Sequence, residues 1–472
     1  MTTVHLPPPR PREWLALLPV ATGLYWLLAD AGGLWLLLAL LPGLLLIGGG
    51  VALLLLPGDA RTLGPVALGA ALGALLTPLA WWVAGLADAF WLLLLSIGTF
   101  LVAGRLSLLR AAQYDGMPEP ERSTRMDAKV ALDELVLGYF VGAASLPSSA
   151  LAARNCEDAA RLESAIAEHG WDEDPSRLHP APQAPEDTQV ERARLWGIDY
   201  EILRFESGFQ PPAPLPGDDR WLRGEANRHC HVRLLRHPGP PRPWLLCIHG
   251  YRMGPAWMDL SLFAPQWLHQ RMGLNMIQPV LPLHGPRSVG AKSGDQFLDG
   301  DLTDLLHAEM QTLWDLRRTL AWLRRHEPEA RVGVLGFSLG GYNTALLSGY
   351  EPDLDFVIAG IPVVDLASAL WRALPPAHLR YFAARGLDET RYRRLLAPVS
   401  PLSRPPLQPV ERRHIFAATG DRIVHPEHPL ALAEHWQVPV TWYQGSHLSV
   451  RRERTMREAV RKAVDGAGWA LR

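Results

Sequence analysis

Residues 331–341 read Arg-Val-Gly-Val-Leu-Gly-Phe-Ser-Leu-Gly-Gly, and this stretch decides how the rest of the chain is interpreted. A strand-like run leads into Gly336-Phe337-Ser338-Leu339-Gly340, and a helix-forming run, Leu339 to Leu347, follows it. This order predicts a nucleophile elbow, the strained strand-to-helix turn that exposes a reactive serine at the edge of a sheet. Glycine is needed two residues before and after the serine because a Cβ there would collide with the neighbouring strand or helix. We therefore expect Ser338 to be a nucleophile.

Two further side chains can complete a catalytic triad with this serine. The strand-like run Arg413–Ala418 is followed by Asp421, and the strand-like run Val438–Tyr443 is followed by His447. A serine hydroxyl is a weak nucleophile until a base with a pKa near 7 takes its proton, and a carboxylate improves that base by fixing its tautomer. We expect His447 to be the base and Asp421 to orient it. The alternatives are His425 and His428 for the base and Asp365 for the acid.

Acyl transfer to a serine also requires hydrogen-bond donors for the oxyanion. The first expected donor is the backbone N–H of Leu339, directly after the serine. The second is the N–H of Tyr251, because His249-Gly250-Tyr251 follows the strand-like run Trp244–Ile248 and Gly250 permits a close backbone approach. A second pair, His284-Gly285, is expected to form a structural loop, with a place at the border of the site as the alternative.

With these residues the chain resembles the α/β-hydrolase superfamily of serine esterases, lipases and acyltransferases. The matching positions are Ser338, Asp421, His447 and the His249-Gly250 loop, and the resemblance covers roughly residues 196–472. It implies an α/β fold: a doubly wound, mostly parallel sheet with helices on both faces and the triad at the carboxyl ends of the strands. It also implies cleavage of carboxylic esters through an acyl-enzyme on Ser338. An acyltransferase with the same triad and a catalytically silent membrane scaffold are the alternatives.

The N-terminal region contains four apolar stretches without charged residues. They are Trp14–Ala29, Gly33–Leu56, Leu63–Ala87 and Ala89–Gly104. A bilayer core of about 30 Å requires about 20 apolar residues in a helix, so the middle two stretches are long enough and the outer two are borderline. A hairpin of soluble helices would show a polar face at helical spacing, and these stretches show none. We expect four membrane spans.

The arginines in the connecting loops predict the orientation in the membrane, since acidic residues contribute little to that rule. Arg10 and Arg12 precede the first span, Arg61 lies between the second and third, and Arg105 and Arg110 follow the fourth. The other two loops contain only Asp30 and Asp88. We therefore expect both termini and the catalytic domain on the cytoplasmic side.

The sequence predicts three consecutive parts. They are a transmembrane helical region at 1–112, a helical connector and linker at 113–195, and a catalytic domain at 196–472. Residues 124–168 contain helix formers and the apolar run Leu135–Val141, which is too short to span a bilayer. We expect a helix there that packs on the catalytic domain or lies at the membrane surface. Residues 172–188, rich in Asp, Glu and Pro, are typical of a linker.

The catalytic domain contains a long insertion at about 365–412, which is expected to form a cap over the active site. Arginines outnumber acids between the strand-like runs that flank it. The arginines are Arg372, Arg380, Arg385, Arg391, Arg393, Arg394, Arg404, Arg412 and Arg413, and the acids are Asp365, Asp388, Glu389 and Glu411. A basic cap beside a membrane predicts an anionic lipid ester as substrate. A solvated, arginine-rich pair of helices is the alternative.

Composition limits the partners. The net charge of −2 argues against nucleic acid, and we expect membrane lipids or a small ester instead. Three cysteines, Cys156, Cys230 and Cys247, are too few for a disulfide framework. The triplet His229-Cys230-His231 has no further ligands nearby in the sequence, so we expect neither a bound metal nor a cofactor.

Overall fold

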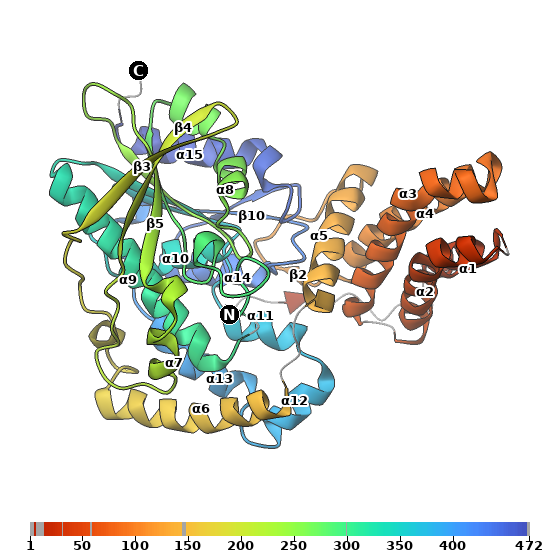
Figure 1. Ribbon diagram of the computed structural model, residues 1–472, viewed down its shortest axis with the longest axis horizontal. Coiled ribbons are helices and arrows are strands. Elements are labelled where there is room, and N and C mark those ends of the chain that lie inside the picture. Colours follow the sequence, from red (N-terminus) through yellow and green to blue (C-terminus); the bar gives the residue numbers. More distant parts are fainter. Residues whose placement is uncertain are drawn as a thin grey trace. The chain divides into compact units, whose positions relative to one another are not determined.

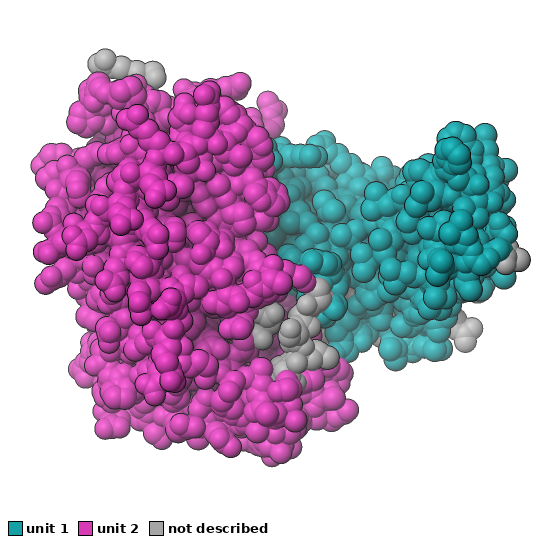
Figure 2. Space-filling model, viewed as in Figure 1, with its two compact units in different colours: residues 1–144, 418–427, 442–453 teal, residues 145–417, 428–441, 454–472 magenta. Residues whose placement is uncertain are grey.

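The computed structural model describes residues 4–5, 14–30, 32–56, 59–143, 148–298 and 300–469. The chain divides into two compact units, which Figure 2 shows in different colours. The first unit contains residues 1–144, 418–427 and 442–453, and the second contains residues 145–417, 428–441 and 454–472. The first unit therefore combines the N-terminal helices with two short segments from near the end of the chain.

Apolar helices form the N-terminal part of the first unit (Figure 1). They are α1 (Leu17–Leu28), which continues a 3-10 turn at Trp14–Ala16, α2 (Gly33–Leu55), α3 (Leu63–Ala84) and α4 (Leu86–Arg110). Three of them, α2, α3 and α4, are long and apolar enough to cross a membrane, whereas Trp14–Leu28 is shorter. The predicted stretch Ala89–Gly104 lies inside α4, so this candidate membrane helix is longer than the sequence suggested. Arg10 and Arg12, used above for the orientation, lie outside the described residues.

The surface and interior of this helical bundle differ as expected for helices in a bilayer. Large apolar side chains point outward; for example, Leu37 is 78% exposed and Trp82 is 86% exposed. Small residues lie between the helices, where Gly43 of α2 is in contact with the turn of α1 around Gly23. Because lipid tails are as apolar as leucine, membrane helices associate through small residues rather than through a leucine core. The bundle therefore supports a membrane location.

Helix α5 (Thr124–Ala143) is also part of the first unit. It follows the short strand β2 (Gln113–Tyr114), which pairs with β1 (Val4–His5). It packs on α3 and α4, and its backbone at Gly138 touches that of Gly64 in α3.

A nine-stranded mixed sheet, with its strands in the order β11-β10-β9-β8-β6-β7-β5-β4-β3, organises the rest of the chain. The strands are β3 (Thr188–Leu195), β4 (Ile198–Glu206), β5 (His229–Leu235), β6 (Trp244–Ile248), β7 (Asn275–Pro279), β8 (Val332–Phe337), β9 (Phe356–Gly360), β10 (Arg413–Ala418) and β11 (Val440–Tyr443). Strands β7, β6, β8, β9 and β10 pair with one another in parallel, whereas β5 is antiparallel to β7 and continues into β4 and β3 as an antiparallel extension. The sheet is therefore mixed and mostly parallel where the serine turn lies.

Every residue of β6, β7, β8 and β9 is buried. Because successive side chains in a strand point to opposite faces, complete burial means that both faces of the sheet are covered. The main helices are α8 (Ala256–Phe263), α9 (Leu302–His326), α10 (Leu339–Ser348), α14 (Glu427–Trp436) and α15 (Arg454–Gly466). Helices α9 and α10 pack on each other and on the central strands, and α15 packs on β9. This arrangement fixes the position of the serine between β8 and α10.

The insertion expected to form a cap contains three helices, α11 (Leu366–Ala373), α12 (Pro376–Ala383) and α13 (Glu389–Leu395). Helix α6 (Ser149–His169) lies beside α12 and α13, and the short helix α7 (Asp218–Leu222) contacts α9 (Figure 1). Arginines of the insertion pair with carboxylates: Arg391 with Glu163 of α6 at 2.7 Å, Arg394 with the same Glu163 at 4.0 Å, and Arg393 with Asp365 at 2.6 Å. These pairs leave less free positive charge on the insertion than its composition suggests.

Candidate active site

Ser338 occupies a strained turn at the end of a buried strand. It connects β8 to α10 with φ +57° and ψ −114°, a backbone conformation that residues with a Cβ rarely adopt. Its N–H donates to Gly360 O at 2.9 Å, and its carbonyl accepts the N–H of Tyr342 at 3.0 Å. The turn is therefore fixed both to the neighbouring strand β9 and to the first turn of the helix.

Both elbow glycines are required by close backbone contacts. A Cβ at Gly336 would collide with the carbonyl oxygen of Gly340, and a Cβ at Gly340 would collide with that of Ile248 at the end of β6. The glycine pattern around Ser338 thus has the steric origin expected from the sequence.

The two expected oxyanion donors belong to segments that lie beside Ser338. Leu339 is the first residue of α10, and the first N–H groups of a helix have no partner within it. On the other side, a Cβ placed on Gly250 would lie 3.5 Å from the Cβ of Ser338, so the loop that contains Tyr251 passes next to the elbow. His249 anchors this loop: its buried imidazole accepts the N–H of Leu281 through Nε2 at 3.1 Å.

His284 lies within the packed interior of the neighbouring loop. Its side chain is fully buried, its Nδ1 is 2.8 Å from Pro282 O, and its ring contacts that of His249 edge to face. Burial is the main reason that the pKa of His284 lies well below its usual value, so the ring stays neutral. These contacts fit the structural role expected for the His284-Gly285 pair.

Asp421 and His447 are hydrogen-bonded to each other in the first unit. The distance between Asp421 Oδ2 and His447 Nδ1 is 2.7 Å, and both side chains are buried. The second carboxylate oxygen, Oδ1, accepts the N–H groups of Ile423 at 3.0 Å and Val424 at 2.7 Å. A neutral His447 that donates from Nδ1 to this fixed carboxylate keeps Nε2 as a proton acceptor, which is the tautomer that a general base needs.

The charges around His447 favour its protonated form. Burial alone would lower the pKa of the imidazole, but the negative charges of Asp421 and Asp133 and the hydrogen bond that His447 donates to Asp421 outweigh burial and raise the pKa above its usual value. The group is thus a stronger base than a histidine in water.

Asp133 of α5 is the functional candidate that the sequence analysis missed. It is fully buried and accepts three backbone N–H groups, from Arg422 at 3.2 Å, His447 at 2.8 Å and Leu448 at 3.1 Å. Burial, with a further contribution from the Asp421 charge, raises the pKa of Asp133 to about 7. One sequence signal could have identified it: Asp133 continues the helical stripe of Met126 and Val130, where an apolar residue is expected.

The alternative acid and base have other partners within the second unit. Asp365 caps α11 by accepting the N–H of Ser368 at 3.1 Å, and it also pairs with Arg393. His428 accepts the N–H groups of Val364 and Asp365 through Nδ1, at 3.4 and 3.3 Å. The structure therefore brings together Asp421 and His447 in one unit, and Ser338, Leu339 and the Tyr251 loop in the other.

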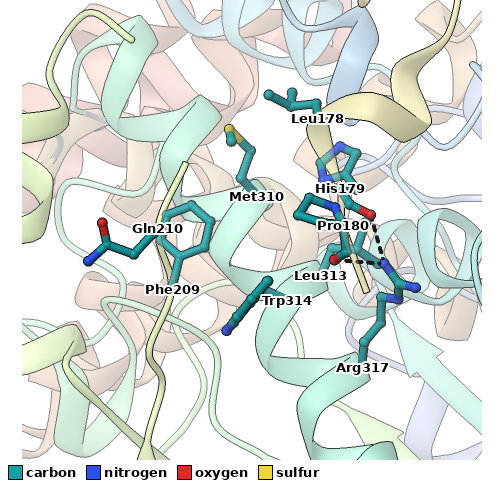
Figure 3. Close-up of a pocket in the computed structure, with 9 residues that line it drawn as sticks. All are labelled: Leu178, His179, Pro180, Phe209, Gln210, Met310, Leu313, Trp314 and Arg317. Carbon is teal, nitrogen blue, oxygen red and sulfur yellow. Dashed lines mark hydrogen bonds between the residues drawn. The ribbon is translucent and has the colours of Figure 1, made fainter. Parts of the chain in front are cut away.

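Figure 3 shows a hollow elsewhere in the second unit. It is lined by Leu178, His179, Pro180, Phe209, Gln210, Met310, Leu313, Trp314 and Arg317. The guanidinium of Arg317 donates to the carbonyl oxygens of His179 at 2.9 Å and Pro180 at 3.2 Å. Its positive charge therefore interacts with other residues that line the hollow. None of the predicted site residues lines this hollow.

Comparison with solved structures finds esterases and peptidases at low similarity. The acetyl xylan esterase 1 of Thermoanaerobacterium sp. JW/SL YS485 has a TM-score of 0.43 and 15% identity, over 62% of this chain and 97% of the esterase. The acetyl xylan esterase of Paenibacillus sp. R4 has a TM-score of 0.42 and 15% identity, over 62% and 93%. The acylaminoacyl peptidase of Pyrococcus horikoshii has a TM-score of 0.33 and 14% identity, over 59% and 40%. These values are too low to support a conclusion about this chain.

Sequence comparison gives a closer relationship. No protein-family model matches the chain. Two proteins of Mycobacterium tuberculosis align with it over 363 residues, which cover 75% of this chain and 86% of each of them. One, from strain CDC 1551, is described as uncharacterized protein MT2702 and is 36% identical; the other, from strain H37Rv, is described as uncharacterized protein Rv2627c and is 35% identical. The chain therefore belongs to the same protein family as MT2702 and Rv2627c.

Proposed function

We propose that the protein is a membrane-anchored serine hydrolase with an α/β-hydrolase catalytic domain, which cleaves carboxylic esters through an acyl-enzyme on Ser338. The observation that carries the proposal is the elbow, where a serine with φ +57° stands between a buried strand and a helix whose close approach requires glycine on both sides. Such a strained backbone conformation persists only where the surrounding structure enforces it, and it is concentrated at functional sites.

The arrangement along the chain supports the same assignment. Ser338 follows β8, Asp421 follows β10 and His447 follows β11, which is the order nucleophile, acid, base of α/β-hydrolases. In the sheet, β6 lies between β8 and β7, so β7 rather than β6 is the neighbour of β5, and β5 is antiparallel to β7. Both features also suit that fold.

The proposed reaction has two steps. In the first, Ser338 Oγ attacks the ester carbonyl carbon while its proton passes to His447 Nε2, and the N–H groups of Leu339 and Tyr251 stabilise the oxyanion. The ester C–O bond then breaks, and His447 returns the proton to the departing alcohol. In the second step, water attacks the acyl carbon, His447 takes a proton from that water, and the acid leaves as the Ser338 Oγ–acyl bond breaks and the serine is protonated again. An alcohol in place of water would give acyl transfer.

Membrane anchoring brings the catalytic domain close to lipid esters, so we propose a lipid or a small apolar ester as substrate. The structure weakens the argument for an anionic substrate, because Arg391 and Arg393 are already paired with carboxylates of the chain itself.

Hydrolysis of p-nitrophenyl butyrate by the purified full-length protein in detergent tests the proposal. We expect turnover by the wild type and a loss of at least about 10³-fold in Ser338→Ala and in His447→Gln. Ser164→Ala is a matched control, since this serine lies on the exposed surface of α6 and should leave turnover unchanged. Equal activity of the wild type and Ser338→Ala would contradict the proposal. Analysis of the products with added alcohols distinguishes acid release from acyl transfer.

A further inference from the structure

Two stripes of side chains run along helix α5 and contact different parts of the first unit. At 100° per residue, the stripes lie about a third of a turn apart around the helix axis. One stripe contains Asp127, Ala131, Glu134 and Gly138, and it faces α3 and α4. The other contains Met126, Lys129, Val130 and Asp133, and it faces the two late segments of the first unit, 418–427 and 442–453. Each stripe has polar contacts of its own, so α5 is held on two sides.

The first stripe joins α5 firmly to the helical bundle. Asp127 forms an ion pair with Arg105 of α4 at 2.8 Å, and Glu134 accepts the hydroxyl of Ser107 of α4 at 2.5 Å. A Cβ on Gly104 would collide with the carbonyl oxygen of Asp127, so the two backbones are in direct contact. The position of α5 is thus set by α4.

The second stripe holds the loops that contain Asp421 and His447. Lys129 donates to Gln444 O at 2.9 Å and pairs with Glu453 at 2.6 Å, on either side of His447 in the sequence. A Cβ on Gly420 would collide with the side chain of Met126, so the acid loop also touches the helix directly.

Asp133 lies at the centre of this second stripe and binds both loops at once. Its Oδ2 accepts the N–H of Arg422, next to Asp421, and the N–H of His447 itself, and its Oδ1 accepts the N–H of Leu448. A carboxylate suits this task because it has two acceptor oxygens and no donor. When the carboxyl group is ionised, the hydrogen bonds that it accepts from backbone N–H groups are about twice as strong as those to a neutral acceptor.

We propose that Asp133 is a positioning residue of the active site, which fixes the Asp421 and His447 loops to the helix that α4 positions. The inference rests on the proposed function, in which His447 is the base. Its consequence is that the helical N-terminal region is part of the catalytic apparatus as well as a membrane anchor. The groups that face His447 are the carboxylates of Asp421 and Asp133, with Glu134 and Arg422 beside them.

The test compares Asp133 with an exposed aspartate, Asp172, in the full-length protein. Asp133→Asn keeps the size of the side chain but turns one acceptor oxygen into a donor group, so at least one N–H loses its partner. Asp172→Asn, at an exposed position of the second unit, is the matched control. We measure kcat and KM for p-nitrophenyl butyrate, the rate at which a fluorophosphonate labels Ser338, and amide hydrogen exchange.

For Asp133→Asn we expect kcat and the labelling rate to fall on the order of 10²-fold, as misplacement of a catalytic group by about 1 Å does, with KM within about twofold. We also expect faster amide exchange at Arg422, His447 and Leu448, whereas Asp172→Asn should keep the wild-type kcat and the wild-type exchange rates. Asp133→Ala removes all three hydrogen bonds, so its kcat should fall further than that of Asp133→Asn. If the Asp133→Ala protein does not accumulate in folded form, the result for Asp133→Asn decides alone.

Wild-type kcat in Asp133→Asn, or unchanged exchange at the three amides, would overturn the inference. The same holds if Asp172→Asn and Asp133→Asn lose equal activity. Failure of the proposed function is recognised separately, from an absence of labelling and turnover in the wild type. The exchange measurement then still decides whether Asp133 holds the two loops.

Discussion

Ser338 combines a reactive position with an unfavourable backbone conformation. For a residue with a Cβ, the conformation at φ +57° and ψ −114° is less favourable than an ordinary one by on the order of 1–3 kcal/mol. The hydrogen bonds from Ser338 N–H to Gly360 O and from Tyr342 N–H to Ser338 O fix that conformation.

This strain predicts that inactive variants at position 338 differ in stability. Ser338→Ala removes the hydroxyl but keeps the Cβ, whereas Ser338→Gly removes both the hydroxyl and the strain. We expect the apparent melting temperature of Ser338→Gly to exceed that of Ser338→Ala by about 2–4 °C. Thermal unfolding of the two purified variants, followed by fluorescence, measures this difference. Equal melting temperatures would show that the turn stores no strain.

The electrostatics of His447 predict the pH dependence of turnover. The base must be neutral to accept a proton, so activity falls as the pH drops below its pKa, and a raised pKa places this fall above pH 6.5. Asp421→Asn removes a negative charge that favours the imidazolium. We expect the acid limb of kcat/KM to move to lower pH, while the plateau falls by about 10⁴-fold because the tautomer is no longer fixed. An acid limb that stays in place would contradict the assigned pair.

Among the structural elements, the elbow depends on backbone contact between α10 and β6. A Cβ at Gly340 would overlap the carbonyl oxygen of Ile248, and neither backbone can move without displacing a central strand. We expect Gly340→Ala to prevent accumulation of folded protein or to lower its melting temperature strongly. Gly466→Ala is the control, because no atom lies within 4 Å of a Cβ there and alanine favours the helix. Similar melting temperatures of the two variants would show that the elbow tolerates a side chain.

The elements that the sequence predicted best have strong local patterns. Strands β6 and β10 have the predicted bounds, because buried parallel strands are short apolar runs that end in glycine or polar residues. The elbow was equally recognisable, since its glycines are a local steric requirement. The site residues themselves remain predictions for the experiments above.

The role of α5 could not be predicted in the same way. Asp133 stands 288 residues before Asp421, and nothing local links a carboxylate in a connector helix to two distant loops. The apolar run Leu135–Val141 suggested a helix that packs on the catalytic domain or lies at the membrane surface, and no role was predicted for Asp133. Only the tertiary contacts show that Asp133, which continues the Met126–Val130 stripe, is buried and accepts three backbone N–H groups.

At the scale of the whole molecule, the charges at the ends of α4 predict the side of the membrane on which catalysis takes place. Asp88 lies in its first turn, Arg105 near its end and Arg110 in its last turn. Positively charged residues favour the cytoplasmic side, so the chain that follows α4 should be cytoplasmic. We expect a C-terminal green fluorescent protein fusion to fluoresce in bacterial cells and a C-terminal alkaline phosphatase fusion to be inactive. The opposite result would place the catalytic domain outside the cytoplasm.

The most direct test of the account is to locate by mass spectrometry the adduct that a fluorophosphonate forms with the full-length protein. We predict a single adduct on Ser338, which forms much more slowly in His447→Gln because the hydroxyl then lacks its base. No adduct, an adduct on another serine, or labelling of Ser338 at an unchanged rate in His447→Gln would contradict the proposal that these residues form one catalytic site.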